Sequence, residues 1–301
     1  MMLVKKPIFI VAFAHGGSGI LIHLIRSHPN VLGIGSTETQ QVFKGTSRES
    51  LQTRFAKLLR YLPILLAERY HVFSVNRWEP RPAFNSFTKK QIDEVLYYEK
   101  LSGCDQRQYL YKTENEIYTL AEIYKSRLVF KNLDGLIFLS AEFAKMYPDG
   151  TFIALVRNGL AVCEGHLRRG HKLKDIAHNY EKACKQIIID SQKIPNYHIV
   201  RYEDIMTKPY DMLKRIYQLS NLDIGLVKKI RLKTTKVITK SGNTEYVHGT
   251  RMKQAIWYEI NNFDKHFRPN TNIHQIKRLS EKQKSIIIEI AKSSLENFNY
   301  L

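Results

Sequence analysis

Short apolar runs alternate with stretches of helical periodicity along most of the chain. The runs at 8–13 and 151–156 have the length and β-rich composition of fully buried strands. Shorter strand candidates stand at 31–34, 128–130 and 197–200. Helical spacing follows at 20–28, 133–146, 160–169, 175–189, 209–219 and 280–297. Strands that alternate with helices predict a mostly parallel sheet covered on both faces, in a three-layer α/β/α fold.

Two regions depart from this alternation. Residues 45–125 are irregular and rich in aromatic side chains, with helix candidates at 51–70 and 91–101. The aromatic residues either line a cleft or simply cover the core. Residues 225–253 carry eight Lys or Arg against one acidic residue, Glu245, and their glycines predict a basic loop. Such a loop is either a solvated linker or a flap over an anion.

Three glycines follow the first predicted strand within a few residues. Gly16, Gly17 and Gly19 lead directly into the helical pattern, so strand, glycine turn and helix succeed one another. This arrangement directs backbone N–H groups and the positive end of a helix at an anion such as a phosphate or sulfate ester. No lysine occurs between Lys6 and Lys44, which argues against a nucleotide kinase or NTPase loop, and the spacing is not GxGxxG. A plain glycine turn without a ligand remains the alternative.

One carboxylate is expected close to this loop. Glu38 stands just past the predicted strand at 31–34, and ligands of open α/β sheets bind at the carboxyl ends of the strands. A carboxylate beside an anion site is electrostatically costly unless it takes part in the chemistry. The alternative is an ordinary loop or helix-capping glutamate.

Charge and cysteine content narrow the class of protein. The net charge of +19 favours a polyanionic partner such as a charged nucleotide, an acidic glycan, anionic lipid or nucleic acid, although a solvated basic surface is the alternative. Three cysteines do not suit a disulfide framework or a zinc site, and no apolar run has the length of a membrane span. Without a signal peptide, these features predict a soluble cytoplasmic protein.

Four segments in order resemble the sulfotransferases that use 3′-phosphoadenosine 5′-phosphosulfate (PAPS), closest to the tyrosylprotein and bacterial branch. Residues 7–29, PIFIVAFAHGGSGILIHLIRSHP, resemble that family's phosphosulfate loop, and 152–162, FIALVRNGLAV, its 3′-phosphate motif. Residues 197–219 and 296–300 are similar to two later family segments. The resemblance leaves out 45–125, which we interpret as an acceptor-side insertion. It implies a single P-loop-like domain over residues 1–301.

The resemblance also implies roles for individual residues. Glu38 would be the catalytic base, and His15 and Lys131 would stabilise charge on the bridging oxygen and the sulfonate. Arg157 would hold the 3′-phosphate, and Arg251 or Lys253 would belong to a basic segment that closes on the nucleotide. The implied nucleotide-binding positions are His15, Gly16, Gly17, Ser18, Gly19, Ile20, Arg157, Gly165, Arg251 and Lys253.

Several positions depart from the family pattern. His15 stands where the family loop has lysine or arginine, and Gly19 replaces its second threonine. Gly165 stands in place of a serine that contacts phosphate, and Leu160 in place of an arginine. Each change is expected to weaken nucleotide binding, although a histidine at position 15 can still donate to the bridging oxygen.

The function implied by the resemblance is in-line transfer of the sulfuryl group of PAPS to a hydroxyl or amine of an acceptor, without a metal. A carbohydrate is the expected acceptor, with peptide tyrosine as the next candidate. Two alternatives stay open: a sulfotransferase fold that has lost catalysis, and a basic nucleic-acid-binding protein. The basic residues are dispersed along the chain, which argues against nucleic acid as the partner.

Overall fold

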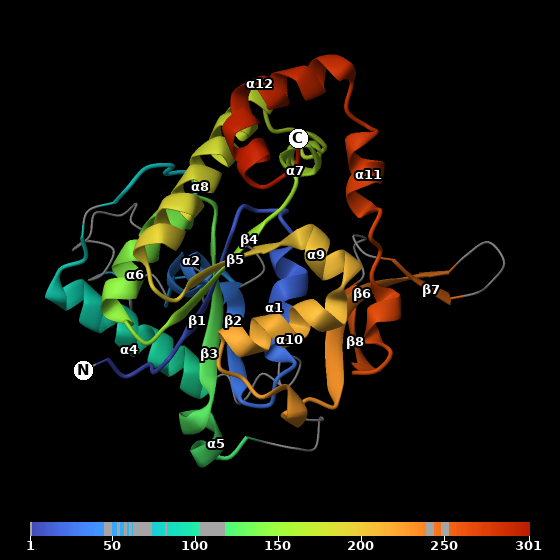
Figure 1. The fold of residues 1–301 in the computed structure, drawn as a ribbon. Coiled ribbons are helices and arrows are strands. Elements are labelled where there is room, and N and C mark those ends of the chain that lie inside the picture. The colour runs from blue at the N-terminus through green and yellow to red at the C-terminus, as the bar shows by residue number, and fades with distance from the viewer. Residues whose placement is uncertain are drawn as a thin grey trace.

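A five-stranded parallel sheet forms the centre of the protein (Figure 1). The computed structural model describes residues 2–44, 50–52, 55–56, 59, 62, 74–81, 83–102, 118–238, 244–247 and 253–301. The strands lie in the order β2-β3-β1-β4-β5, and each neighbouring pair is parallel. They are β1 (Ile8–Ala12), β2 (Val31–Glu38), β3 (Arg127–Leu133), β4 (Thr151–Val156) and β5 (Tyr197–Arg201).

Side chains of β1 alternate between two apolar clusters. Phe9 and Val11 belong to one cluster, and Ile8 belongs to the other on the opposite face of the sheet. Phe9 stacks on Phe152 of the neighbouring strand, with ring centroids 4.4 Å apart. A strand that pairs on both sides and is covered on both faces is apolar throughout, which is why the run at 8–13 predicted β1 correctly.

Helices cover both faces of the sheet, so the expected three-layer α/β/α fold is confirmed (Figure 1). The cluster around Phe9 is covered by α2 (Thr39–Lys44), α4 (Ser86–Ser102), α6 (Ser140–Met146), α7 (Gly159–Leu167), α8 (Leu173–Lys193) and α12 (Glu281–Asn297). The cluster around Ile8 is covered by α1 (Ser18–Arg26), α9 (Tyr202–Thr207) and α10 (Pro209–Leu219). Shorter elements are α5 (Leu120–Lys125), η3 (Asp134–Leu139), η4 (Ile224–Leu226), η5 (Phe263–His266) and α11 (Thr271–Ile276).

The prediction of a basic loop over 225–253 was wrong. The described part of this region forms an antiparallel sheet in the order β7-β6-β8, made of β6 (Lys229–Ile238), β7 (Thr244–Val247) and β8 (Lys253–Glu259). Ile230 and Leu232 of β6 are buried in the cluster that α1 covers, so the strand is fixed by apolar contact despite its positive charge. Arg251 lies outside the described residues. Lys253 opens β8, but its side chain is likewise outside the description.

The region 45–125 is described only in part. The helix expected at 91–101 is α4, which begins five residues earlier at Ser86. Most of the helix expected at 51–70 lies outside the described residues. The single-domain organisation and the acceptor-side role of this region stay predictions.

The described residues contain neither a membrane-spanning helix nor a cluster of side chains that could hold a metal ion. None of the helices in this part of the chain combines the length and the hydrophobicity that crossing a bilayer takes. Within the same residues, His, Cys, Asp and Glu side chains do not gather in groups of three or more that could hold a metal ion.

Candidate active site

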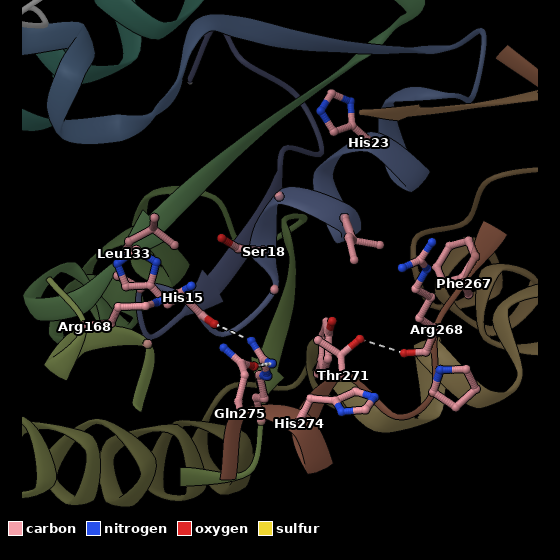
Figure 2. Close-up of a pocket in the computed structure, with 18 of the residues that line it drawn as sticks. His15, Ser18, His23, Leu133, Arg168, Phe267, Arg268, Thr271, His274 and Gln275 are labelled. Atoms are coloured by element: carbon pink, nitrogen blue, oxygen red, sulfur yellow. Dashed lines mark hydrogen bonds between the residues drawn. The ribbon is translucent and has the colours of Figure 1, made fainter. Parts of the chain in front are cut away.

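A cavity of about 1080 Å³ lies where the strands of the parallel sheet end. Residues at or just after the ends of all five strands line it, from Ala14 after β1 to Tyr202 after β5. Among the described lining residues, six are Lys or Arg, three are His and one, Glu38, is acidic. Figure 2 shows the labelled side chains around Ser18, with His15 on one side and Arg268 on the other. The cavity therefore suits an anionic ligand.

The glycine loop between β1 and α1 forms one wall. His15 and Gly17 both have positive φ, 64° and 97°, so the backbone turns sharply before the helix begins. A Cβ on Gly17 would lie 2.2 Å from Cδ2 of Tyr202, so only glycine fits at this position. The N–H of Ala14 donates to Oδ1 of Asp134 at 2.7 Å and ties the start of the loop to the end of β3.

The loop leaves a short row of backbone donors at the start of α1. The N–H of Gly16 donates to the carbonyl of Phe13 at 3.0 Å, and the N–H of Ile20 donates to the carbonyl of Gly17 at 2.9 Å. Neither N–H is then available to a ligand, so fewer backbone donors than predicted remain to bind an anion. Within the described part of the chain, no backbone hydrogen bond uses the N–H of Gly17, Ser18 or Gly19, and all three residues line the cavity. These are the orphan donors of a helix N-terminus.

Arg157 follows β4 and is buried in the cavity wall. Its Nη1 donates to the carbonyl of His15 at 2.8 Å, its Nε to Oδ1 of Asn272 at 2.8 Å, and its Nη2 to Oε1 of Gln275. The guanidinium also lies over the ring of Tyr202, 4.3 Å from its centroid. Burial lowers the pKa of Arg157, although not enough to remove its charge near neutral pH.

His15 borders the cavity without a positive charge. Its ring lies 4.6 Å from that of His166, whose Nε2 is 3.1 Å from the carbonyl oxygen of Ala14. Desolvation by burial in the cavity wall, with His166 and Arg169 as the next causes, lowers the pKa of His15 to about 3. Burial likewise lowers the pKa of His166 to about 4. At neutral pH His15 can donate a hydrogen bond, but it does not supply the charge of a lysine or arginine at this position.

Glu38 and Lys131 meet on the β2–β3 side of the cavity. Nζ of Lys131 lies 3.5 Å from Oε1 of Glu38, and Gln40 donates to Oε2 of Glu38 at 2.7 Å. The two residues are register partners on β2 and β3, after a shift between Gly33 and Glu38. Glu38 is thus the last residue of β2, whereas the sequence placed it past a strand end. Irregular pairing of this kind often re-aims a side chain beside an active site.

Gly165 lies in α7 and lines the cavity, as its predicted role requires. A Cβ at Gly165 would have Cβ of His15 as its nearest neighbour at 3.7 Å, which is an ordinary contact. The backbone would therefore accept the serine that the family pattern has at this position.

The sequence analysis missed several residues that line the cavity or support its wall. Asp134 holds the glycine loop, and burial raises its pKa to about 6. The others are basic side chains and amides from the end of α7 and from the segment around α11, namely Arg168, Arg169, Arg268, Asn272, His274, Gln275 and Arg278. The residues of α11 are more than a hundred positions from Arg157 in the sequence, so no local pattern indicated that they contact it.

Comparisons with known proteins give one family. The family model described as "Sulfotransferase family" matches residues 7–224. No curated protein matches the sequence.

Among solved structures, the chain is similar to the sulfotransferase domain from the curacin biosynthetic pathway, with 14% identity, 96% of this chain and 97% of that chain covered, and a TM-score of 0.47. It is also similar to the sulfotransferase domain from the Synechococcus PCC 7002 olefin synthase, with 16% identity, coverage of 74% and 78%, and a TM-score of 0.42. A sulfotransferase from Mycobacterium tuberculosis H37Rv shows 15% identity, coverage of 73% and 68%, and a TM-score of 0.41. Because the family model spans most of the chain, including the glycine loop and the Arg157 segment, the protein belongs to the sulfotransferase family.

Proposed function

We propose that the protein transfers the sulfuryl group of PAPS to a hydroxyl or amine of an acceptor. The observation that carries the proposal is the cavity at the strand ends, where six Lys or Arg and one described carboxylate face the same space. Family membership supports sulfuryl transfer in general. PAPS as donor, Glu38 as base and the class of acceptor are parts of the proposal.

The residues present fit a nucleotide that carries several phosphate or sulfate groups. The cradle at Gly17 has no room for a side chain, and Gly17, Ser18 and Gly19 offer backbone N–H groups beside it. Arg157 is the candidate for the 3′-phosphate because guanidinium N–H groups match phosphate geometry. We assign the hydroxyl of Ser18 to the same cradle, while Arg251 and Lys253 stay predictions. When bound, PAPS supplies the sulfuryl group, which leaves the bridging oxygen as the acceptor oxygen or nitrogen bonds to sulfur.

Three side chains take part in the proposed reaction. Glu38 accepts the proton of the acceptor group as general base. The Lys131 ammonium, 3.5 Å from Glu38, stabilises negative charge that develops next to that carboxylate. Neutral His15 donates a hydrogen bond to the leaving oxygen, a weaker contribution than a cation would make. The work of the protein is chiefly positioning and charge stabilisation.

We infer a carbohydrate acceptor first and peptide tyrosine second. The cationic lining of the cavity favours an acceptor that itself carries acidic groups, because a cationic acceptor would be repelled. A cytoplasmic location, which the cysteine content suggested, stays a prediction.

Ligand-dependent thermal unfolding tests the donor. We expect adenosine 3′,5′-bisphosphate at about 100 times its Kd to stabilise the fold by about 2.7 kcal/mol, a rise of several degrees in Tm. AMP at the same concentration should give a smaller rise. No rise with the bisphosphate, together with a salt-sensitive rise with a short oligonucleotide, would replace the proposal with the nucleic-acid-binding alternative.

One observation favours a second candidate, a sulfotransferase fold that binds the nucleotide without turnover. The loop position that carries a cation in the family is occupied by His15, which is neutral at physiological pH. Incubation with ³⁵S-labelled PAPS and panels of glycans and tyrosyl peptides separates the two. Labelled product supports the enzyme, and tight binding without labelled product in any panel supports the binding protein.

A further inference from the structure

A chain of hydrogen bonds runs from Arg157 away from the cavity. Nε of Arg157 donates to Oδ1 of Asn272 at 2.8 Å, and the amide nitrogen of Asn272 donates to Oε1 of Glu203. The same Oε1 accepts the backbone N–H of Asn158 at 2.9 Å. Glu203 lies in α9, within the residues that the family model matches. Asn272 lies in α11, beyond them. The sequence analysis assigned no role to either residue.

Tyr300 completes this chain from the other side. Its hydroxyl donates to Oε2 of Glu203 at 2.7 Å, and its ring lies against the guanidinium of Arg201, 4.8 Å from Cζ. Burial raises the pKa of Tyr300, so the phenol keeps the proton that it donates. Both oxygens of the Glu203 carboxylate are therefore engaged by named donors.

The carboxylate decides which way the Asn272 amide points. An asparagine side chain has one end that accepts and one end that donates. Because Glu203 accepts only, the NH₂ of Asn272 faces it, and the carbonyl oxygen is left for Arg157. The reversed amide would put a donor against the Nε–H of Arg157 and an oxygen against the carboxylate. Glu203 thus sets the acceptor that Arg157 meets.

Among the residues that the structure describes, no partner takes up the second N–H on either terminal nitrogen of Arg157. Nη1 uses one N–H on the carbonyl of His15, and Nη2 uses one on Gln275. Each of these nitrogens carries two N–H groups, so one on each remains. The ring of Tyr202 supports one face of the plane at 4.3 Å. A cation held in this way has little freedom to lose when it binds an anion.

We propose that Glu203, Asn272 and Tyr300 are positioning residues, which hold the Arg157 guanidinium in the orientation that binds a phosphate group of the nucleotide. The proposal rests on the proposed function, in which Arg157 binds that group. Neither Glu203 nor Tyr300 lines the cavity, so they act through Asn272 and Arg157.

A double-mutant cycle tests this proposal on the full-length protein. We expect Asn272→Ala to weaken the binding of adenosine 3′,5′-bisphosphate about tenfold. Tyr300→Phe should weaken it about threefold, because each variant removes one hydrogen bond of the chain that leads to Arg157. AMP affinity should change less than about twofold in both, since the lost orientation matters most at the 3′-phosphate. In Arg157→Ala, adding Asn272→Ala should cause no further loss, because its effect passes through the missing guanidinium. Full additivity of the two losses would overturn the proposal.

Matched variants and a second measurement separate this proposal from the proposed function. Asn179→Ala in α8 and Tyr210→Phe in α10, which do not line the cavity, should leave both affinities unchanged. In ¹⁵N-arginine-labelled protein, the Nε–H signal absent from Arg157→Ala should exchange with solvent faster in Asn272→Ala than in wild type. An unchanged exchange rate would contradict the positioning role. Wild type that binds neither nucleotide, with the exchange rate still raised, would overturn the proposed function alone.

Discussion

At the α7–α11 end of the cavity, Arg157 donates from all three guanidinium nitrogens to groups on the loop and on α11, whereas at the β2–β3 end Glu38 meets Lys131 across neighbouring strands. The first end joins residues more than a hundred positions apart, and two of its acceptors are neutral amides. The second end depends on strand register, with a shift between Gly33 and Glu38.

The contacts around Arg157 and the Glu38–Lys131 pair suit different tasks. A binding site gains affinity when its donors are already ordered, which is what the contacts around Arg157 provide. A general base must instead reach the proton of an acceptor whose identity is set elsewhere in the cavity. We therefore expect substitutions at the Arg157 end to change nucleotide affinity, and substitutions at the Glu38 end to change turnover.

The largest effect should come from Glu38→Gln. Loss of the general base should lower the rate of ³⁵S transfer from PAPS about 10²–10⁴-fold, while adenosine 3′,5′-bisphosphate affinity stays within about threefold of wild type. Glu94→Gln in α4, which is not among the residues that line the cavity, is the matched control and should leave both unchanged. A Glu38→Gln enzyme with near-normal turnover would remove the functional distinction between the two ends.

Arg157→Ala should produce the opposite pattern at the other end. Loss of a charge-assisted contact should weaken the binding of adenosine 3′,5′-bisphosphate about 30-fold and the binding of AMP much less, as measured by calorimetric titration. Arg215→Ala, an exposed arginine of α10, provides the control for loss of one positive charge. Equal weakening of both nucleotides would show that Arg157 does not contact the 3′-phosphate.

A pair of glycine variants tests the packing of the loop between β1 and α1. Gly17→Ala should lower the free energy of unfolding by about 2 kcal/mol, because φ is 97° and the new Cβ would meet the Tyr202 ring that supports Arg157. Gly19→Ala should stay within about 0.5 kcal/mol of wild type, since nothing lies within 4 Å of a Cβ there. Denaturant titration measures both, and equal stabilities would contradict the close packing at Gly17.

The smallest effect concerns pH. The pKa of His15 is lowered to about 3 in the folded protein but is about 6.5 in an unfolded chain. Between these values the unfolded state binds more protons, so stability falls as the pH falls below about 6.5. In His15→Gln, the loss of Tm between pH 7 and pH 5 should be about 2 °C smaller than in wild type. The same loss in both proteins would contradict the lowered pKa.

The central sheet could be predicted because its strands are buried on both faces. The runs at 8–13 and 151–156 needed no partner to be recognised as strands. The Arg157 segment and the glycine loop were found because both follow such a run directly. The part of the fold prediction that is confirmed is therefore the part whose signal lies within a few neighbouring residues.

The antiparallel sheet was missed although its signal was present. Ile230 and Leu232 alternate with basic residues, and period-two alternation is typical of a half-buried strand. The interpretation as a loop gave more weight to net charge and glycines than to this alternation. Long lysine and arginine side chains on one face do not prevent a strand whose other face is buried.

The supports of Arg157 could not be predicted in the same way. Asn272 and Gln275 are polar residues of a short helix, and what gives them a role is contact with a side chain far away in sequence. The lowered pKa of His15 likewise depends on desolvation by burial, and next on His166 and Arg169, which the fold brings close to the loop. Such effects follow from tertiary packing, which one sequence does not contain as a local pattern.

A crystal structure of the protein with adenosine 3′,5′-bisphosphate tests the proposed site most directly. We expect the 5′-phosphate at the N–H groups of Gly17, Ser18 and Gly19, and the 3′-phosphate on the two remaining N–H groups of Arg157. The Arg157 contacts to Asn272 and Gln275 should be unchanged by binding. A nucleotide bound outside this cavity, or bound in it without contact to Arg157, would contradict the assignment.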